Sequence, residues 1–225
     1  MTKGNIRMTE SYRTLYLPGE GELVEKKSRF IATTALAESE EEALSFIESM
    51  RKKYWNATHN CWAFITGPDN GVMRCGDDGE PQGTAGRPML DVLLGEKLYN
   101  ICVVVTRYFG GTLLGTGGLV RAYSKAVQEG LGSSRLIEKK LGRRMRIGCD
   151  YNMIGKVQYQ LAQAGILTLD TQYAEDVETL ILVPEREVGQ ATELLIRATG
   201  AKASVLAEEQ VWFAAFEKEV LLFEH

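Results

Sequence analysis

Five glycines fall within nine residues of the segment RYFGGTLLGTGGLVRAYSKA, which runs from residue 107 to residue 126. An apolar, strand-like run precedes the glycines and a helical pattern follows them, which is the order of elements found at many phosphate sites. Backbone N–H groups at the start of a helix attract anions, and the helix dipole adds to that attraction. The segment is therefore a candidate phosphate-binding loop. Its glycines are Gly110, Gly111, Gly115, Gly117 and Gly118.

The glycine spacing matches neither of the two familiar nucleotide-binding fingerprints. A P-loop requires a lysine directly after its second glycine, but Thr116 follows Gly115. The dinucleotide pattern G-x-G-x-x-G begins at Gly115 and Gly117 and then meets Val120. The spacing excludes both a mononucleotide P-loop and a Rossmann site.

Basic side chains flank the glycines, and they leave two interpretations open. Arg107 precedes the loop, while Arg121 and Lys125 lie four residues apart on the polar face of the following helix. In one interpretation the three side chains surround a nest of glycine N–H groups and converge on a phosphate. In the other, the glycines only permit positive φ angles and close packing of the loop on a sheet.

An acidic cluster, Asp77, Asp78 and Glu80, lies in a loop rich in glycine and proline. Clustered oxygens are the ligands that Mg²⁺ and Ca²⁺ prefer, but the D-D-G-E order does not fit an EF-hand. A solvated turn whose aspartates cap nearby N–H groups is a second interpretation. A third is a salt link to Arg107 and Arg121 that holds the two loops together.

His59 and Cys61 are two residues apart in a strand-like run and would share one face of that strand. They could act as a general base and a nucleophile. A catalytic thiol requires an electropositive, partly exposed setting, whereas Cys61 lies beside Trp62 and Phe64 in an apolar run. The sequence favours a packed thiol and a hydrogen-bonded histidine.

The densest basic stretch of the chain lies between residues 135 and 146. If it is a strand, Arg144 and Arg146 point one way and Arg143 the opposite way. These three side chains could follow a nucleic-acid backbone, or they could belong to an ordinary charged linker. The basic residues are Arg135, Lys139, Lys140, Arg143, Arg144 and Arg146.

The composition sets limits on the class of protein. The chain has 225 residues, a formal net charge of −4 and 44% hydrophobic residues, so nucleic-acid binding would require a local basic patch. No apolar run is long enough for a membrane helix, and the polar start lacks the apolar stretch of a secretory signal. Four cysteines without a C-x-x-C pair indicate free thiols in a cytoplasmic protein, and two histidines do not favour a zinc site. We expect no cofactor.

The elements that position the glycine loop are predicted from periodicity and turn signals. Ser39 and Glu42 form a capping box at the start of the first helix. The run 100–109 is continuously apolar and β-branched, which is typical of a strand buried on both faces. Residues before 22 are expected to form a polar leader. Strands are expected at 22–37, 60–67, 72–75 and 100–109, and helices at 39–54, 89–98 and 119–131.

A polar, basic segment bounded by glycines, 132–142, marks the predicted boundary between two domains, 1–136 and 137–225. Beyond it the pattern predicts strand, helix, two strands, helix and strand, which is the βαββαβ order of a ferredoxin-like domain. The apolar tail from residue 211 onward is expected to form either an added strand or a short helix. The fold class is therefore α+β.

Three motifs, RYFGGTLLGTGGLVRAYSKA, DDGEPQGTAGRP and HNCWAF, resemble the signature of the IMPACT family, whose bacterial branch is also called the YigZ family. The resemblance covers about residues 20–131, and the C-terminal half resembles the small domain that accompanies this module in bacteria. It implies an N-terminal fold similar to the second domain of the fifth small-subunit ribosomal protein. It also implies a C-terminal fold similar to a ferredoxin-like domain of elongation factor G. Eukaryotic members are associated with translation control through a regulator of a translation-factor kinase.

The resemblance favours a non-enzymatic protein that binds RNA, the ribosome or a translation-regulatory protein. Arg107, Arg121 and Lys125 would contact phosphate with help from the glycine N–H groups, and the basic strand at 143–146 would extend the footprint. Two alternatives stay open: a metal-dependent phosphate-ester or nucleotide hydrolase using Asp77 and Asp78, and a protein–protein adaptor. The sequence leaves the partner and the oligomeric state undetermined.

Overall fold

The computed structural model describes residues 9–217 and 219–223. The chain divides after Glu138 into two compact units, an N-terminal and a C-terminal unit. No helix in the described part of the chain is both long and apolar enough to cross a bilayer.

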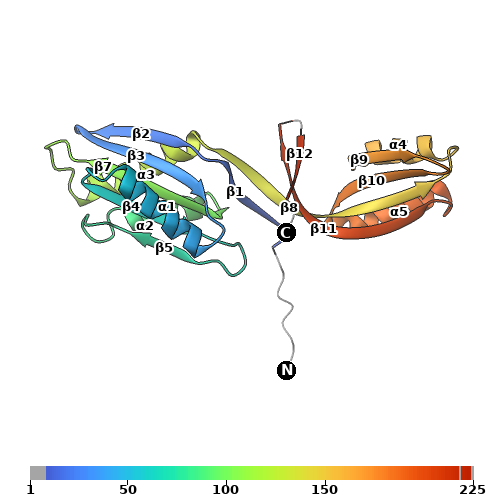
Figure 1. Ribbon diagram of the computed structural model, residues 1–225, viewed down its shortest axis with the longest axis horizontal. Coiled ribbons are helices and arrows are strands. Elements are labelled where there is room, and N and C mark those ends of the chain that lie inside the picture. Colours follow the sequence, from blue (N-terminus) through green and yellow to red (C-terminus); the bar gives the residue numbers. More distant parts are fainter. Residues whose placement is uncertain (1–8, 218, 224–225) are drawn as a thin grey trace, which may run out of the picture. The chain divides into compact units, whose positions relative to one another are not determined.

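The N-terminal unit contains a five-stranded sheet in which every neighbouring pair of strands is antiparallel. Its strand order is β2-β3-β7-β4-β5 (Figure 1). A short parallel pair, β1 with β6, accompanies the sheet. The strands are β1 (Ser11–Leu17), β2 (Glu20–Glu25), β3 (Ser28–Leu36), β4 (His59–Ile65), β5 (Met73–Gly76), β6 (Leu98–Tyr99) and β7 (Ile101–Tyr108).

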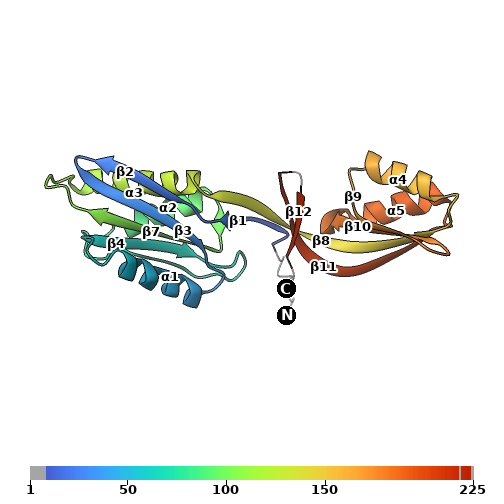
Figure 2. The same ribbon diagram turned by 45° about the horizontal axis from the view of Figure 1, so that its top comes forward.

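Helices cover both faces of this sheet. Helix α1 (Glu40–Lys53) lies on one face, and α2 (Gly86–Gly95) and α3 (Thr116–Gly132) lie on the other (Figure 2). Seven of the eight residues of β7 are buried, so the predicted strand with two covered faces is confirmed. One core, with Ile47 and Phe64, packs under α1, and the larger core packs under α2 and α3.

Local sequence accounts for the start of α1, whereas the predictions for the first part of the chain needed correction. Ser39 caps α1 as predicted, because its side chain accepts a hydrogen bond from the Glu42 N–H at 3.2 Å. The predicted strand 22–37 is instead the hairpin β2–β3, which turns at Lys26 and Lys27 with φ angles of 45° and 68°. The predicted polar leader contains β1.

The C-terminal unit has the predicted βαββαβ order. Its antiparallel sheet runs β9-β10-β8-β11-β12, and the first four of these strands have the ferredoxin-like arrangement. The apolar tail forms an added strand, β12, against β11. The elements are β8 (Arg135–Cys149), α4 (Ile154–Gln163), β9 (Leu167–Tyr173), β10 (Val177–Pro184), a 3-10 turn (Glu185–Glu187), α5 (Val188–Thr199), β11 (Ser204–Phe216) and β12 (Glu219–Phe223).

The segment 132–142 is not a linker loop. Helix α3 ends at Gly132 and β8 already begins at Arg135, so the limit between the two compact units falls inside this strand. Its charges are compatible with a strand because buried and exposed positions alternate, with Ile137 and Lys139 buried and Glu138 exposed. The exact domain limits, 1–136 and 137–225, stay a proposal.

Candidate functional site

A pocket of about 430 Å³ opens beside the glycine loop of the N-terminal unit. The start of β4, the acidic loop and the first turn of α3 contribute its walls, and we call it the His59 pocket. Apolar side chains supply most of its surface. The pocket is lined by Thr58, His59, Gly79, Glu80, Pro81, Arg107, Phe109, Leu113, Leu114, Gly115, Thr116 and Leu119.

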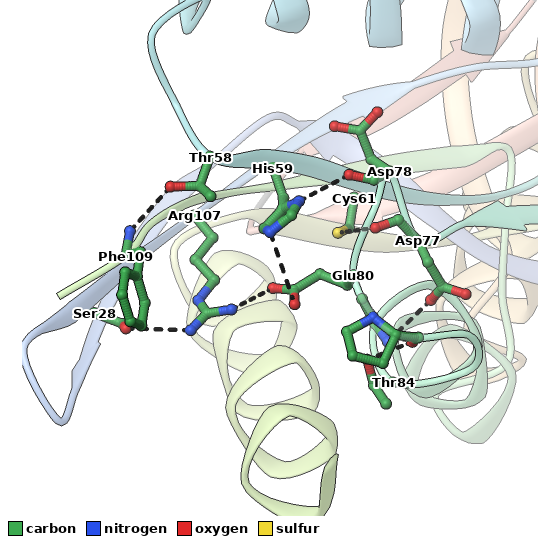
Figure 3. A network of polar contacts seen from close by, with 12 residues as sticks. Ser28, Thr58, His59, Cys61, Asp77, Asp78, Glu80, Thr84, Arg107 and Phe109 are labelled. Carbon is green, nitrogen blue, oxygen red and sulfur yellow. Dashed lines mark hydrogen bonds and ion pairs between the residues drawn. The ribbon is translucent and has the colours of Figure 1, made fainter. Parts of the chain in front are cut away.

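A buried ion pair lies at this pocket (Figure 3). Arg107 Nη1 donates to Glu80 Oε1 at 2.6 Å, and the two side chains are only 6% and 3% exposed. Arg107 Nη2 donates to Ser28 Oγ at 3.4 Å, whereas Arg107 Nε is buried without a hydrogen-bond partner. The guanidinium also lies over the rings of Phe30 and Phe109. The predicted salt link between the acidic loop and Arg107 is confirmed, whereas the described residues show no such link to Arg121.

His59 joins the ion pair from β4. Its Nδ1 lies 2.8 Å from the carbonyl oxygen of Asp78, which can only accept, so Nδ1 is the donor. Its Nε2 lies 3.8 Å from Glu80 Oε2, which is longer than a hydrogen bond. The histidine is therefore hydrogen-bonded as predicted, and Nε2 remains directed toward the carboxylate (Figure 3).

Cys61 lies in the core and not at a reactive surface. Its thiol donates to the carbonyl oxygen of Asp77 at 2.9 Å, and its sulfur lies 3.3 Å from Tyr123 Oη. Burial raises the pKa of Cys61 well above its usual value, so the thiolate is disfavoured. Tyr123 in turn donates to Glu80 Oε1 at 2.8 Å, and burial raises the pKa of this tyrosine. The prediction of a packed thiol is confirmed.

The aspartates of the acidic loop accept backbone hydrogen bonds. Asp77 accepts from the N–H groups of Gly83, Ala85 and Gly86 at 2.8–3.1 Å. These hydrogen bonds cap the start of α2, which begins at Gly86 and therefore earlier than predicted. Asp78 accepts from the Asn60 N–H at 2.7 Å. Among the described residues, no three His, Cys, Asp or Glu side chains are grouped as metal ligands would be. The acidic loop therefore has the capped-turn geometry.

Gly110 permits close packing of the loop, and Gly115 precedes α3 without capping its N-terminus. A Cβ on Gly110 would lie 2.0 Å from the carbonyl carbon of Lys27, so only glycine fits there. Gly115 has a φ of 71° and precedes α3 without a capping side chain. Gly117 and Gly118, predicted to lie in the loop, belong to the first turn of α3. Gly115 thus supplies no side-chain acceptor to the first N–H groups of that helix.

Arg121 and Lys125 line a second, smaller hollow of about 230 Å³, between the β2–β3 hairpin and α3. Lys26 joins them there from the hairpin turn, and Glu25 is the acidic residue of this lining. We call it the basic groove. The predicted convergence of Arg107 with these side chains is wrong, because Arg107 is paired with Glu80 at the His59 pocket.

The predicted basic footprint on β8 consists of arginines that are already paired. Arg143 donates to Glu185 at 2.7 Å, and this hydrogen bond is the main reason why the pKa of Glu185 is lowered. Arg144 pairs with Glu209 at 2.8 Å. Arg146 pairs with two carboxylates, on β10 and β11, at 2.8 and 2.7 Å. Their positive charge is neutralised within the C-terminal unit.

Sequence reasoning missed several lining residues. Lys26 reaches the basic groove only because a hairpin turns there, and the chain has no glycine or asparagine at that turn to signal it. Phe109 and Thr116 are neighbours of the glycines, but nothing in their types marked them as pocket residues. The pocket is a product of how the loops pack.

Comparison with known proteins shows that two family models match separate parts of the chain. Residues 26–131 match the Impact N-terminal domain, and residues 147–202 match a domain of unknown function, DUF1949. The Bacillus subtilis IMPACT family member YvyE is 43% identical over 88% of this chain and 91% of its own length. The Escherichia coli IMPACT family member YigZ is 35% identical over 82% and 92%.

A solved structure described as a hypothetical protein is also similar. It is 33% identical, with a TM-score of 0.58, and the match covers 90% of this chain and 99% of that one. Eukaryotic IMPACT homologs, from Dictyostelium discoideum and Schizosaccharomyces pombe, match a shorter part of the chain. Because the identity to bacterial members extends over most of both chains, this protein belongs to the IMPACT family.

Proposed function

We propose that the N-terminal unit binds the phosphate backbone of structured RNA through the basic groove. Membership of a family that includes eukaryotic IMPACT homologs is compatible with a translation-associated regulator. RNA of the translation machinery is the finer proposal. It follows from the charges of the groove.

The proposal rests on three basic side chains of the groove that form no ion pair within the described residues. Within residues 9–217 and 219–223, Lys26, Arg121 and Lys125 form no ion pair, although all three line one groove. Glu25 leaves that lining with an excess of two positive charges. Unpaired, exposed lysine and arginine side chains are the groups that release counterions from a nucleic-acid backbone.

The test is fluorescence anisotropy with a labelled ribosomal RNA hairpin, repeated over a series of salt concentrations. We expect the logarithm of affinity to fall with the logarithm of salt concentration. The double variant Arg121→Ala, Lys125→Ala should weaken binding and reduce the salt slope by about one unit for each lost phosphate contact. The matched control is Lys156→Ala, Lys202→Ala, which removes the same charge from exposed positions of the C-terminal unit. Equal slopes in the two double variants would refute the assignment.

The alternatives have less support. A metal-dependent hydrolase would use Asp77 and Asp78, but the oxygens of Asp77 already accept three N–H groups. Arg143, Arg144 and Arg146 are paired, so we propose the groove and not β8 as the main contact. An adaptor function would appear in the same experiment as an absence of RNA binding even at low salt.

A further inference from the structure

We propose that the His59 pocket binds a ribonucleotide, either as a free ribonucleoside monophosphate or as the terminal nucleotide of an RNA strand. The two sources share a phosphate monoester, a ribose and an aromatic base. This inference goes beyond the backbone contact proposed above, and it does not depend on RNA binding at the basic groove.

The phosphate would bind at the start of α3. Gly115 and Thr116 both line the pocket, and Thr116 is the first residue of this 17-residue helix. A helix start is usually capped by a Ser, Thr, Asp or Asn side chain, but Gly115 supplies none. The free N–H groups and the positive end of the helix dipole together favour an anion.

Arg107 provides an independent indication of a ligand at the same place. Its side chain lines the pocket and is 6% exposed, and its Nε–H is buried without an acceptor. A buried donor without a partner is rare in proteins, because the lost hydrogen bond to water is not replaced. A phosphate oxygen would be a suitable acceptor. The pairing of Arg107 with Glu80 also keeps the charge of that carboxylate from repelling an anion.

The hydroxyl groups of the ribose would donate to His59 and Glu80 from the pocket side. Because Nδ1 of His59 donates to a carbonyl oxygen, the neutral ring carries its lone pair on Nε2. That atom and Glu80 Oε2 are 3.8 Å apart, too far to share a proton directly. Two acceptors at this spacing suit the hydroxyl donors of a ribose, and a carboxylate has this role in dinucleotide sites.

The base would stack on Phe109. This ring is 47% exposed and lies at the pocket, and Leu113 beside it is 82% exposed. Exposed aromatic rings are the usual platforms for nucleobases. The volume of about 430 Å³ lies within the range of small-molecule sites, about 300–1,000 Å³.

The experiment is calorimetric titration of the full chain with each of the four ribonucleoside 5′-monophosphates, their 2′-deoxy analogues and inorganic phosphate. We expect at least one ribonucleotide to bind more tightly than phosphate, and its 2′-deoxy analogue to bind about fivefold more weakly. Thr116→Asp should weaken binding at least about tenfold, because a carboxylate at this position stabilises the helix and repels the phosphate. Phe109→Leu should weaken it at least about fivefold.

The controls are Thr112→Asp and Trp55→Leu, which make the same kinds of change at exposed positions outside the lining. Both should leave nucleotide affinity unchanged, as should Lys125→Ala, so failure of the RNA-backbone proposal would not affect this result. A 5′-phosphorylated RNA that is displaced by the mononucleotide would identify a strand end as the source. Equal binding of phosphorylated and unphosphorylated RNA, alongside mononucleotide binding, would identify the free nucleotide.

Three results would overturn the proposal. No binding of any ribonucleotide at millimolar concentration would remove the site. Inorganic phosphate binding as tightly as every nucleotide would remove the ribose and base contacts. Equal affinities in Thr116→Asp and Thr112→Asp, with both proteins folded by thermal melting, would remove the helix start as the phosphate site.

Discussion

Substitution of Glu80 by glutamine should destabilise the N-terminal unit by about 3 kcal/mol. Its carboxylate is bound to Arg107 at 2.6 Å, and the side chains are 3% and 6% exposed, so the arginine would keep a buried charge without its counterion. Breaking a buried pair from one side costs about 3–5 kcal/mol. We expect the lower end, because glutamine keeps an oxygen for the Tyr123 hydroxyl, which donates to Glu80 at 2.8 Å.

The measurement is urea unfolding followed by tryptophan fluorescence. Trp55 and Trp62 report on the N-terminal unit, and Trp212 reports on the C-terminal unit. The matched control is Asp91→Asn, which breaks the Arg87–Asp91 pair at 2.8 Å, where the side chains are 66% and 54% exposed. Because water screens that pair, its loss should cost less than about 0.5 kcal/mol.

A double-variant cycle separates the ion pair from the effects of each side chain. Arg107→Met should be costly alone, since it leaves the Glu80 carboxylate buried and unpaired. Combined with Glu80→Gln, it should cost less than the sum of the single changes by at least about 1 kcal/mol. A Glu80→Gln cost no larger than that of Asp91→Asn, or additive single costs, would refute the reasoning that the pair is desolvated.

Three further predictions follow from close contacts and from pKa values. Gly110→Ala should destabilise the N-terminal unit by at least about 1–3 kcal/mol, since its Cβ would lie 2.0 Å from backbone. Gly95→Ala, which meets no atom within 4 Å, should be neutral or stabilising in the same urea assay. Native protein should react with a disulfide-exchange thiol reagent first at Cys75. Burial raises the pKa of all four thiols, but Cys75 is half-buried, whereas the other three cysteines are buried. Equal reaction rates at all four cysteines would contradict this prediction. The lowered pKa of Glu185 means that its pairing with Arg143 stabilises the fold above the unfolded pKa of about 4.3 and is lost as pH falls through the folded value. An NMR titration midpoint for Glu185 at or above 4.3 would contradict it.

Regular periodicity made much of the fold predictable from the sequence. The C-terminal order of strands and helices follows from alternating and helical patterns separated by turn residues. Ser39 and Glu42 located the start of α1, because side-chain capping is a local interaction. Such features depend on neighbours within a few residues, so a sequence displays them directly.

The missed features either go against local propensity or depend on other parts of the chain. The hairpin turn at Lys26 and Lys27 uses positive φ angles at lysines, which local propensity does not favour. The strand β1, SYRTLYL, pairs in parallel with β6 near residue 98, and the sequence does not reveal that partner. The start of α2 is set by Asp77, several residues earlier, so the apolar pattern alone placed it too late.

Charge density along the sequence proved a poor guide to charge available for binding. The three arginines of β8 lie within four residues, yet each has a carboxylate partner from β11, from β10 or from the turn that follows β10. The acidic partners are not in the directly opposed positions, where Arg146 faces Leu180 and Leu206, but the neighbouring strands and the turn after β10 hold them within ion-pair distance of the arginines. Arg121 and Lys125 are sparser, but they lie on an exposed helix face and form no ion pair within the described residues, although Glu25 lines the same groove. A binding surface is therefore better inferred from cations that the fold leaves unpaired than from those that the sequence crowds together.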